Sequence, residues 1–449
     1  MKKIFQYIML AVVTIVMASC TSDIEETTAA TGKSNVQLVV GEFPAFGDSQ
    51  TRAIGTPDEG KTSWAEGDEL LLEIDNTSYG RHNATFTYNG SSWELTSGEL
   101  VYLEGDPAYI SHVYYAPNYK WEAGKLVLKE GKDPGTDEYI EGNARITGNG
   151  ETITVSFAEA TRKYSRLRIA TLPNEQITVD TEYFTPAGSS DMEQNGNYTL
   201  TSDEKGNAYL YGTFENNSEV TVKYREAALT TYTFSQATES AKSYALDATV
   251  ISANSAEEIK SAIEQKVADG KTTIRLNLAP NAGTNEFMAI REAIKGAAPN
   301  DLGTIELTII GVETIPEEAF YKMLQLKSVR MSDVKEIKKY AFKECQYLTV
   351  VEAPSLNKLY SGAFKKCDQL SKLTFGPINY ADERNWPIFE YITPNIDLIL
   401  SDYQKEMIET DDYLYTANND RDYAGSDEHN SKNFLGREFK SITCRYPVE

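Results

Sequence analysis

Residues 337–351 read Ile337-Lys-Lys-Tyr-Ala-Phe-Lys-Glu-Cys-Gln-Tyr-Leu-Thr-Val-Val351, and the apolar positions of this stretch recur every 22 residues. Ala341-Phe342 is preceded by Ala319-Phe320 and followed by Ala363-Phe364 at that spacing. Five apolar columns in one register are not expected by chance, so this part of the chain is a repeat whose turns stack on one another. The other four columns are Ile315, Ile337 and Leu359; Leu326, Leu348 and Leu370; Leu307, Val329, Val351 and Leu373; and Ile309, Met331, Ala353 and Phe375.

This period lies within the range of leucine-rich repeats, which place one short strand in each turn of a solenoid. We assign three repeats, to residues 312–333, 334–355 and 356–377. Asn385-Trp386 falls where another Ala-Phe pair would stand, so we expect a degenerate turn to follow. The whole domain is predicted to span residues 252–449.

Both ends of a solenoid need caps, because the terminal turns would otherwise expose apolar faces. Ser255-Ala-Glu-Glu258 is a capping box that begins a helix, and Gly270 ends this helix. A strand at 273–278 and a second helix near 287–295 are expected next. The segments 396–400 and 434–442 are predicted to close the other end, with an acidic loop at 411–432 between them.

The chain has four cysteines, three histidines and no C-x-x-C motif, so a zinc site is not expected. Cys345 and Cys367 occupy one repeat column, which predicts that both point into the core as small apolar side chains. A disulfide between them and reactive thiols are the two alternatives.

From Val36 to about Ile251 the sequence consists of short β-rich runs separated by turn signals. Ala84-Thr-Phe-Thr-Tyr88 leads into the turn Asn89-Gly90, and Trp93-Glu-Leu95 is the returning strand. This spacing predicts antiparallel β-sandwiches, and the length favours two of them, at 35–160 and 161–251. The predicted fold class is a mainly β N-terminal half, with two β-sandwich domains in series, followed by an α/β leucine-rich-repeat solenoid.

Residues 1–19 have the pattern of a signal peptide, with a basic start and an apolar run too short to span a bilayer. Met17-Ala18-Ser19-Cys20 resembles the lipobox of bacterial lipoproteins, which implies acylation of Cys20; an ordinary cleaved signal is the alternative. Asp23, Glu25 and Glu26 resemble an export signal to the outer leaflet, which implies a lipid-anchored protein at the surface of the outer membrane. Residues 20–34 are expected to be a flexible tether.

The chain is acidic, with 43 Lys+Arg against 67 Asp+Glu and a formal charge of −24. This balance argues against a nucleic-acid partner and against docking on anionic lipids by charge. His82 and His112 have no catalytic motif near them, and Asp420, Asp422 and Gly425 match a calcium loop only in part. We therefore expect no enzymatic activity, no metal and no cofactor.

Four stretches of the N-terminal half carry a family resemblance: Thr51-Arg52-Ala53, Thr62-Ser63-Trp64-Ala65-Glu66-Gly67-Asp68, residues 84–93 and the closing strand Ala241-Lys-Ser-Tyr-Ala-Leu-Asp-Ala248. In these stretches the chain resembles the fimbrillin-like proteins, which are shaft, anchor and tip subunits of one class of fimbriae. This resemblance implies two transthyretin-like sandwich domains in series, assembly by strand donation, and proteolytic trimming after Arg52.

The stretch 337–351 resembles the BspA-type leucine-rich repeats of surface proteins, a family associated with adhesion to host matrix proteins or other cells. The two resemblances imply a surface adhesin or a fimbria-associated, tip- or anchor-like subunit. Its partner would be a protein on host or neighbouring cells, or other fimbrial subunits, with membrane contact through the lipid anchor only. The alternative is a glycan-binding accessory lipoprotein of a nutrient-uptake system.

Candidate binding residues follow from the alternation of side chains across a strand, because residues between the apolar columns must face outward. The basic residues among them predict a basic island on an acidic chain, which would steer an acidic partner. The alternative is an ordinary polar face of a solenoid. The candidates are Lys327, Ser328, Arg330, Thr349, Glu352, Ser371, Lys372 and Thr374.

Overall fold

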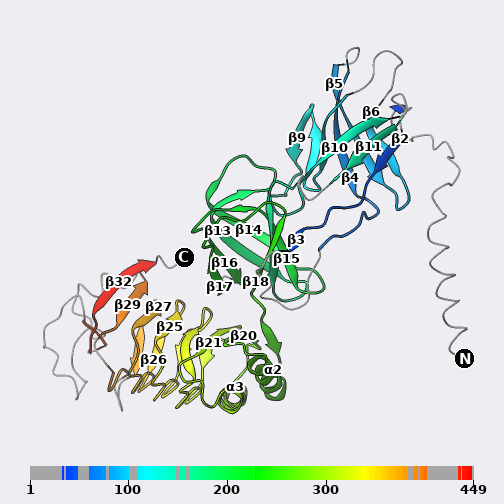
Figure 1. Cartoon of the computed structure of the whole chain (residues 1–449). Coiled ribbons are helices and arrows are strands. Elements are labelled where there is room, and N and C mark those ends of the chain that lie inside the picture. The colour runs from blue at the N-terminus through cyan, green and yellow to red at the C-terminus, as the bar shows by residue number, and fades with distance from the viewer. Residues whose placement is uncertain are drawn as a thin grey trace, which may run out of the picture. The chain divides into compact units, whose positions relative to one another are not determined.

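The structure of the chain is a computed structural model (Figure 1). It describes residues 33–34, 37–48, 60–76, 80–100, 109–147, 152–157, 162–225, 227–382, 388–392, 395–401, 433–435 and 437–446. The chain divides into two compact units, of which the first is Met1–Phe46, Glu59–Lys132 and Asp137–Lys163 and the second is Gly47–Asp58, Asp133–Thr136 and Tyr164–Glu449. The second unit holds both the region 164–251 and the repeats, so the boundaries 35–160, 161–251 and 252–449 stay predictions.

Several predicted features lie outside the described residues: the signal peptide, Cys20, Arg52, Asn385-Trp386 and the loop 411–432. Among the residues that are described, no helix is long and apolar enough to cross a membrane. The same residues contain no group of three or more His, Cys, Asp or Glu side chains that could hold a metal ion.

An eight-stranded sheet makes up most of the first unit, in the order β1-β6-β5-β4-β7-β10-β11-β2. The predicted hairpin is confirmed, because β5 and β6 are antiparallel partners with Tyr88 opposite Trp93. A separate hairpin is formed by β8 and β9. The strands are β1 Lys33–Ser34, β2 Gln37–Val40, β4 Glu69–Asn76, β5 Gly80–Tyr88, β6 Trp93–Leu100, β7 Tyr109–Tyr115, β8 Tyr119–Glu122, β9 Lys125–Leu128, β10 Ile140–Thr147 and β11 Thr152–Ser156.

A second eight-stranded sheet has the order β17-β16-β13-β15-β12-β18-β3, with β14 paired to β13. Its strands are β3 Gly47–Asp48, β12 Ser165–Ala170, β13 Gln176–Pro186, β14 Glu193–Thr201, β15 Asn207–Phe214, β16 Glu219–Tyr224, β17 Ala227–Thr233 and β18 Lys242–Asp247. Most neighbours are antiparallel, but β18 is parallel to β12, as β2 is to β11 in the first unit. The purely antiparallel prediction was wrong there, because a strand's own pattern does not identify a partner distant in sequence. In each of the two regions the strands are hydrogen-bonded in one continuous sheet. The arrangement of each region as two facing sheets of a sandwich therefore stays a prediction.

The 22-residue register is confirmed by the strand pairing of the repeats, where Val329 lies opposite Val351 and Val351 opposite Leu373. One parallel sheet has the order β19-β20-β21-β23-β25-β27-β29-β32, and a second has β22-β24-β26-β28. The strands are β19 Ile251–Ala253, β20 Thr273–Leu278, β21 Ile305–Ile310, β22 Thr314–Ile315, β23 Leu326–Arg330, β24 Glu336–Ile337, β25 Val350–Ala353, β26 Lys358–Tyr360, β27 Lys372–Phe375, β28 Tyr380–Asp382, β29 Asp397–Ser401 and β32 Ser441–Tyr446, with a short antiparallel pair of β30 Asn433–Phe434 and β31 Arg437–Glu438.

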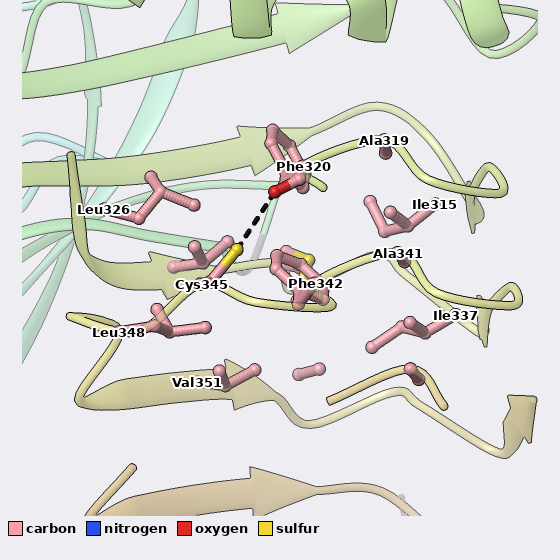
Figure 2. Packing of buried hydrophobic residues seen from close by; sticks show 14 of the residues in the cluster. Ile315, Ala319, Phe320, Leu326, Ile337, Ala341, Phe342, Cys345, Leu348 and Val351 are labelled. Atoms are coloured by element: carbon pink, nitrogen blue, oxygen red, sulfur yellow. Dashed lines mark hydrogen bonds between the residues drawn. The ribbon is translucent and has the colours of Figure 1, made fainter. Parts of the chain in front are cut away.

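The apolar columns of the repeats form one hydrophobic core (Figure 2). Cys345 and Cys367 are fully buried and free, so their predicted burial is confirmed and the disulfide alternative is wrong. Figure 2 shows the Sγ of Cys345 donating to the carbonyl oxygen of Phe320, at 3.0 Å. Burial raises the pKa of Cys345 to about 12, so its thiolate is scarce at neutral pH and the reactive-thiol alternative is not supported.

The fourth turn uses a pair three residues beyond the predicted position. The ring of Phe389 stacks on Phe364 with centroids 5.7 Å apart, and the backbone nitrogen of Phe364 donates to the oxygen of Ile388 at 3.0 Å. Ile388-Phe389 therefore takes the place that we expected Asn385-Trp386 to take. The step from Leu373 to its partner Leu398 is also longer than 22 residues, so the extra residues are accommodated in this turn.

Two helices lie at the beginning of the repeat region, α2 Ala256–Ala268 and α3 Thr284–Ala297. The predicted capping box is confirmed, because the Ser255 side chain accepts from the nitrogen of Glu258 at 3.3 Å. The second helix is longer at both ends than predicted, and its apolar side is buried in the core of the repeats. At the other end β29 and β32 extend the long sheet, and Phe439 packs edge-on against Phe389 at 5.6 Å.

Candidate binding surface

The eight candidate binding residues lie on or beside three neighbouring strands of the long parallel sheet. We call them the strand surface. Lys327 and Ser371 are exposed and the other six are half-buried, whereas Val329, Val351 and Leu373 are fully buried. The alternation of side chains across a strand produces this pattern. The members of the strand surface are Lys327, Ser328 and Arg330 in β23, Thr349 and Glu352 at β25, and Ser371, Lys372 and Thr374 at β27.

Each basic residue of the strand surface is paired with a carboxylate from a neighbouring strand. The Nζ of Lys327 lies 2.7 Å from Glu306, the Nε of Arg330 2.8 Å from Glu352, and the Nζ of Lys372 3.8 Å from Glu352. The surface is therefore a ladder of mixed charge, and the predicted basic island is corrected. Glu306 was not among the predicted residues, although it directly precedes Leu307 of a repeat column.

Two hydroxyl groups of the strand surface are used within the stack. The Oγ1 of Thr349 donates to the backbone oxygen of Lys327 at 2.8 Å, and the Oγ of Ser371 donates to that of Thr349 at 3.0 Å. These bonds join successive turns beside the ladder of backbone hydrogen bonds. The surface can therefore offer a partner its charged side chains and the hydroxyls of Ser328 and Thr374.

Arg330 belongs to a row of residues that lie opposite one another on neighbouring strands, and this row begins at the buried residue Arg275. Arg275 of β20 lies opposite Thr308, and Thr308 opposite Arg330. The Nε of Arg275 donates to the oxygen of Leu229 at 2.6 Å, and its Nη1 lies 3.9 Å from Asp247. Desolvation lowers the pKa of Arg275, and the charge of Asp247 opposes this shift. This end of the row is covered by β17 and β18, so the accessible part begins at β23.

The motif around Trp64, part of the fimbrillin-like resemblance, has a structural role in the first unit. The Trp64 ring packs edge-on against Trp93 and Tyr115, with centroids 5.2 Å away in each case. The Asp68 carboxylate accepts from the nitrogen of Ala65 at 2.7 Å and from the hydroxyl of Tyr115 at 3.0 Å. Burial, together with the Asp68 charge, raises the pKa of Tyr115. The motif thus fixes a turn against an aromatic core.

The aromatic residues of β7 and β8 pack against one another. Tyr114 lies 5.7 Å from Tyr139 and 6.4 Å from Trp121, and Tyr119 lies 5.2 Å from Tyr139, between ring centroids. His112 stacks on Tyr114 at 5.8 Å. These rings pack against one another in edge-on and tilted contacts, so the cluster has a packing role in the first unit.

Residues 302–396 match the family described as the BspA type leucine rich repeat region, in six copies. The BspA-type repeats are therefore confirmed in this part of the chain. Among solved structures, a similar chain is GBS52, the minor pilin of the gram-positive pathogen Streptococcus agalactiae. It has 10% identity, a TM-score of 0.17, and coverage of 48% of this chain and 94% of the pilin, values that carry no argument about the fold. No curated protein matches the chain.

Proposed function

We propose that this chain is a lipid-anchored protein at the surface of a bacterial outer membrane, and that it acts as an adhesin or as a tip- or anchor-like fimbrial subunit. The stack of BspA-type repeats carries this proposal, because successive turns present the same outward positions on rigid, paired strands. A surface held in this way loses little conformational entropy on binding. In this proposal the stack is a leucine-rich-repeat solenoid that two transthyretin-like sandwich domains connect to the tether.

The proposed partner is a protein on host or neighbouring cells, or another fimbrial subunit, and it docks on the strand surface. Successive strands there carry carboxylates and cations in turn, so a partner must match a charge pattern and not merely a net charge. The series is Glu306 in β21, Lys327 and Arg330 in β23, Glu352 in β25 and Lys372 in β27. Membrane contact is through the lipid on Cys20 only. The proposed function is binding without catalysis, cofactor, metal or nucleic acid.

The alternative, a glycan-binding accessory lipoprotein of a nutrient-uptake system, has less support. The aromatic side chains around Tyr114, which could stack on a sugar, contact one another.

The anchoring part of the proposal is tested with Cys20→Ala. Without the acylated residue the protein should move from the membrane fraction to the soluble fraction, because each buried methylene of a lipid chain contributes about 0.8 kcal/mol to membrane binding. Fractionation with immunoblotting measures this, and Thr21→Ala, which leaves Met17-Ala18-Ser19-Cys20 unchanged, is the control. Membrane retention of the Ala variant, with no lipid on the unchanged protein, would refute the anchor.

The binding part is tested by presenting residues 21–449 to an array of host matrix and bacterial surface proteins. Changing Lys327, Arg330 and Lys372 to Gln should lower the affinity for the ligand identified on the array by about tenfold, mainly through faster dissociation. Reversal to Glu is avoided, because it would place carboxylates beside Glu306 and Glu352. A matched triple Gln variant at exposed Lys205, Lys260 and Lys271 should bind normally. Equal binding by both variants would exclude the strand surface.

A further inference from the structure

In both β regions of the chain, an entry strand is paired with the exit strand. In the first unit β2, which follows the two-residue strand β1, is parallel to β11, the strand after which the chain leaves that sheet (Figure 1). In the region 164–251 the first strand, β12, is parallel to the last, β18. Strands joined by short turns pair antiparallel instead, as β10 does with β11 and β13 with β14. The two parallel pairs therefore join the points where the chain enters and leaves each region.

Parallel pairing decides how a pull on the two ends of a region acts on the hydrogen bonds. The entry strand is pulled toward its N-terminus, and the exit strand is pulled toward its C-terminus. Because the two strands run in the same direction, these pulls slide them past one another, and the evenly spaced bonds of a parallel ladder share the load. In an antiparallel pair both pulled ends would lie at the same end of the ladder, and the bonds would break one after another.

The pair of β2 and β11 is reinforced just beyond its last residues. Four residue pairs join the strands, and the nitrogen of Gly41 donates to the oxygen of Val155 at 2.9 Å. Arg162, which is 1% exposed, forms an ion pair with Glu138, and its Nη2 donates to the oxygen of Pro44 at 2.8 Å. The exit segment is thus bound to the entry segment twice, by the ladder and by a buried guanidinium group.

The pair of β12 and β18 is longer. Five residue pairs join these strands, from Arg166 opposite Ser243 to Ala170 opposite Asp247. The nitrogen of Ala248 donates to the oxygen of Ala170 at 2.8 Å, and the Nε of Arg166 donates to the Oγ of Ser243 at 3.0 Å. Backbone and side-chain bonds therefore oppose sliding at both ends of this pair.

The exit from β18 is connected directly to the repeats. The carboxylate of Asp247 accepts from the nitrogen of Thr249 at 2.9 Å and lies 3.9 Å from Arg275 of β20. The Oγ1 of Thr249 accepts from the Nζ of Lys266 in α2 at 2.9 Å. Strand β19 begins two residues later, at Ile251. A pull on the repeats therefore reaches β18 through a short connection that is hydrogen-bonded to α2.

We propose that the two parallel pairs are mechanical clamps, which keep the β regions folded under tension between a surface anchor and a partner bound by the repeats. The inference rests on the proposed function, because tension arises where one end of the chain is anchored and the other is held. Forced unfolding is governed by the barrier to unfolding. The sliding geometry raises this barrier, because several bonds must break together. The same pairing of entry and exit strands occurs in two sheets with different strand orders.

The first test pulls the region 164–251 in two directions, in residues 21–449 with Cys444→Ser. Handles on Lys163→Cys and Lys260→Cys, at exposed positions, load β12 at its N-terminal end and β18 at its C-terminal end, so the strands slide. Handles on Lys163→Cys and Glu239→Cys load the adjacent N-terminal ends of both strands and peel them apart. At one constant force, unfolding with the sliding handles should be at least about tenfold slower than with the peeling handles.

The second test pulls the first unit between the N-terminal end of residues 21–449 and a handle on Lys163→Cys. Because the Gly41 nitrogen faces β11, alternation along the strand places the Val39 nitrogen toward β11 and the Val40 nitrogen away from it. Val39→Pro therefore removes a bond of the clamp at an exposed side chain, and Val40→Pro is the matched control at the edge of the sheet. Under constant force Val39→Pro should unfold about fivefold faster than Val40→Pro.

Equal unfolding rates with the two sets of handles would overturn the proposal, and so would equal rates for the two proline variants. Circular dichroism and urea unfolding check that each variant is folded. If Val39→Pro is unfolded, the comparison of handles decides, because it leaves both strand pairs unchanged. Neither measurement involves a membrane or a ligand. A failed clamp therefore leaves the proposed adhesin standing, and the loss of anchor or ligand leaves the clamp standing.

Discussion

Phe342 lies between two other phenylalanine rings, Phe320 and Phe364, with centroids 5.1 and 5.4 Å away. It is fully buried, as the Ala-Phe column predicts. Phe342→Ala should lower the free energy of unfolding by about 3–5 kcal/mol, because it removes apolar contacts and leaves a cavity between two turns. Urea unfolding followed by circular dichroism measures this loss.

Phe342→Leu is the matched control, since it keeps an apolar side chain in the column and should lose about 1–2 kcal/mol. A loss below about 1 kcal/mol for the Ala variant would mean that the ring does not hold the two turns together.

At the scale of the turn, the left-handed position is occupied by Glu318, Tyr340 and Gly362 in successive repeats. Of these three residues only Gly362 is glycine, so the left-handed backbone alone does not require glycine at this position. The Tyr340 ring explains the difference, because a Cβ at residue 362 would lie 2.5 Å from its Cε1. The ring of one turn thus occupies the space that a side chain of the next turn would need.

Gly362→Ala should therefore destabilise the chain by about 1–3 kcal/mol, through the left-handed backbone and the contact with the ring. Gly296→Ala is the control. This glycine lies inside α3 and its added Cβ would meet nothing within 4 Å, so the change should stabilise by about 0.5–1 kcal/mol. Thermal unfolding of both variants separates the two effects. A neutral Gly362→Ala would show that the Tyr340 ring moves aside freely.

At the scale of the whole molecule, the repeat region contacts the β region of residues 164–251, which belongs to the same compact unit. Ile310, the last residue of β21, is buried in the hydrophobic cluster of that β region. Arg275 donates to Leu229 of β17. Contacts between neighbouring turns still supply most of the core of the repeats. The contact with the β region therefore adds to a stack whose core is already formed by its own turns.

A fragment of residues 249–449 should therefore fold alone. It starts before the predicted boundary at 252, because β19 begins at Ile251 and pairs with Leu276 of β20. Ile310→Ala should cost about 2 kcal/mol or more in the whole chain and less than half of that in the fragment, where the side chain has lost its neighbours. Urea unfolding of the four proteins measures both values. A fragment without a cooperative transition would refute the independence of the repeats.

The sequence alone determined the repeat and its consequences: the columns, the 22-residue strand register, the buried free cysteines, the hairpin at Asn89-Gly90 and the capping box at Ser255. All of these depend on periodic burial or on hydrogen bonds between residues close in sequence. The outward position of the strand surface was predictable for the same reason, since alternation across a strand is a local property.

Only the tertiary structure decided which side chains and strands lie beside one another, and therefore the charge of the exposed surfaces. The pairing of Lys327 with Glu306, the parallel contact of β18 with β12, the use of Ile388-Phe389 and the position of Lys343 between two tyrosines all join residues from different turns or strands. The charge of a surface depends on which side chains lie within a few ångströms of one another. That distance is set by the stacking of turns, and residues about 21 positions apart in sequence become neighbours only once the turns have stacked.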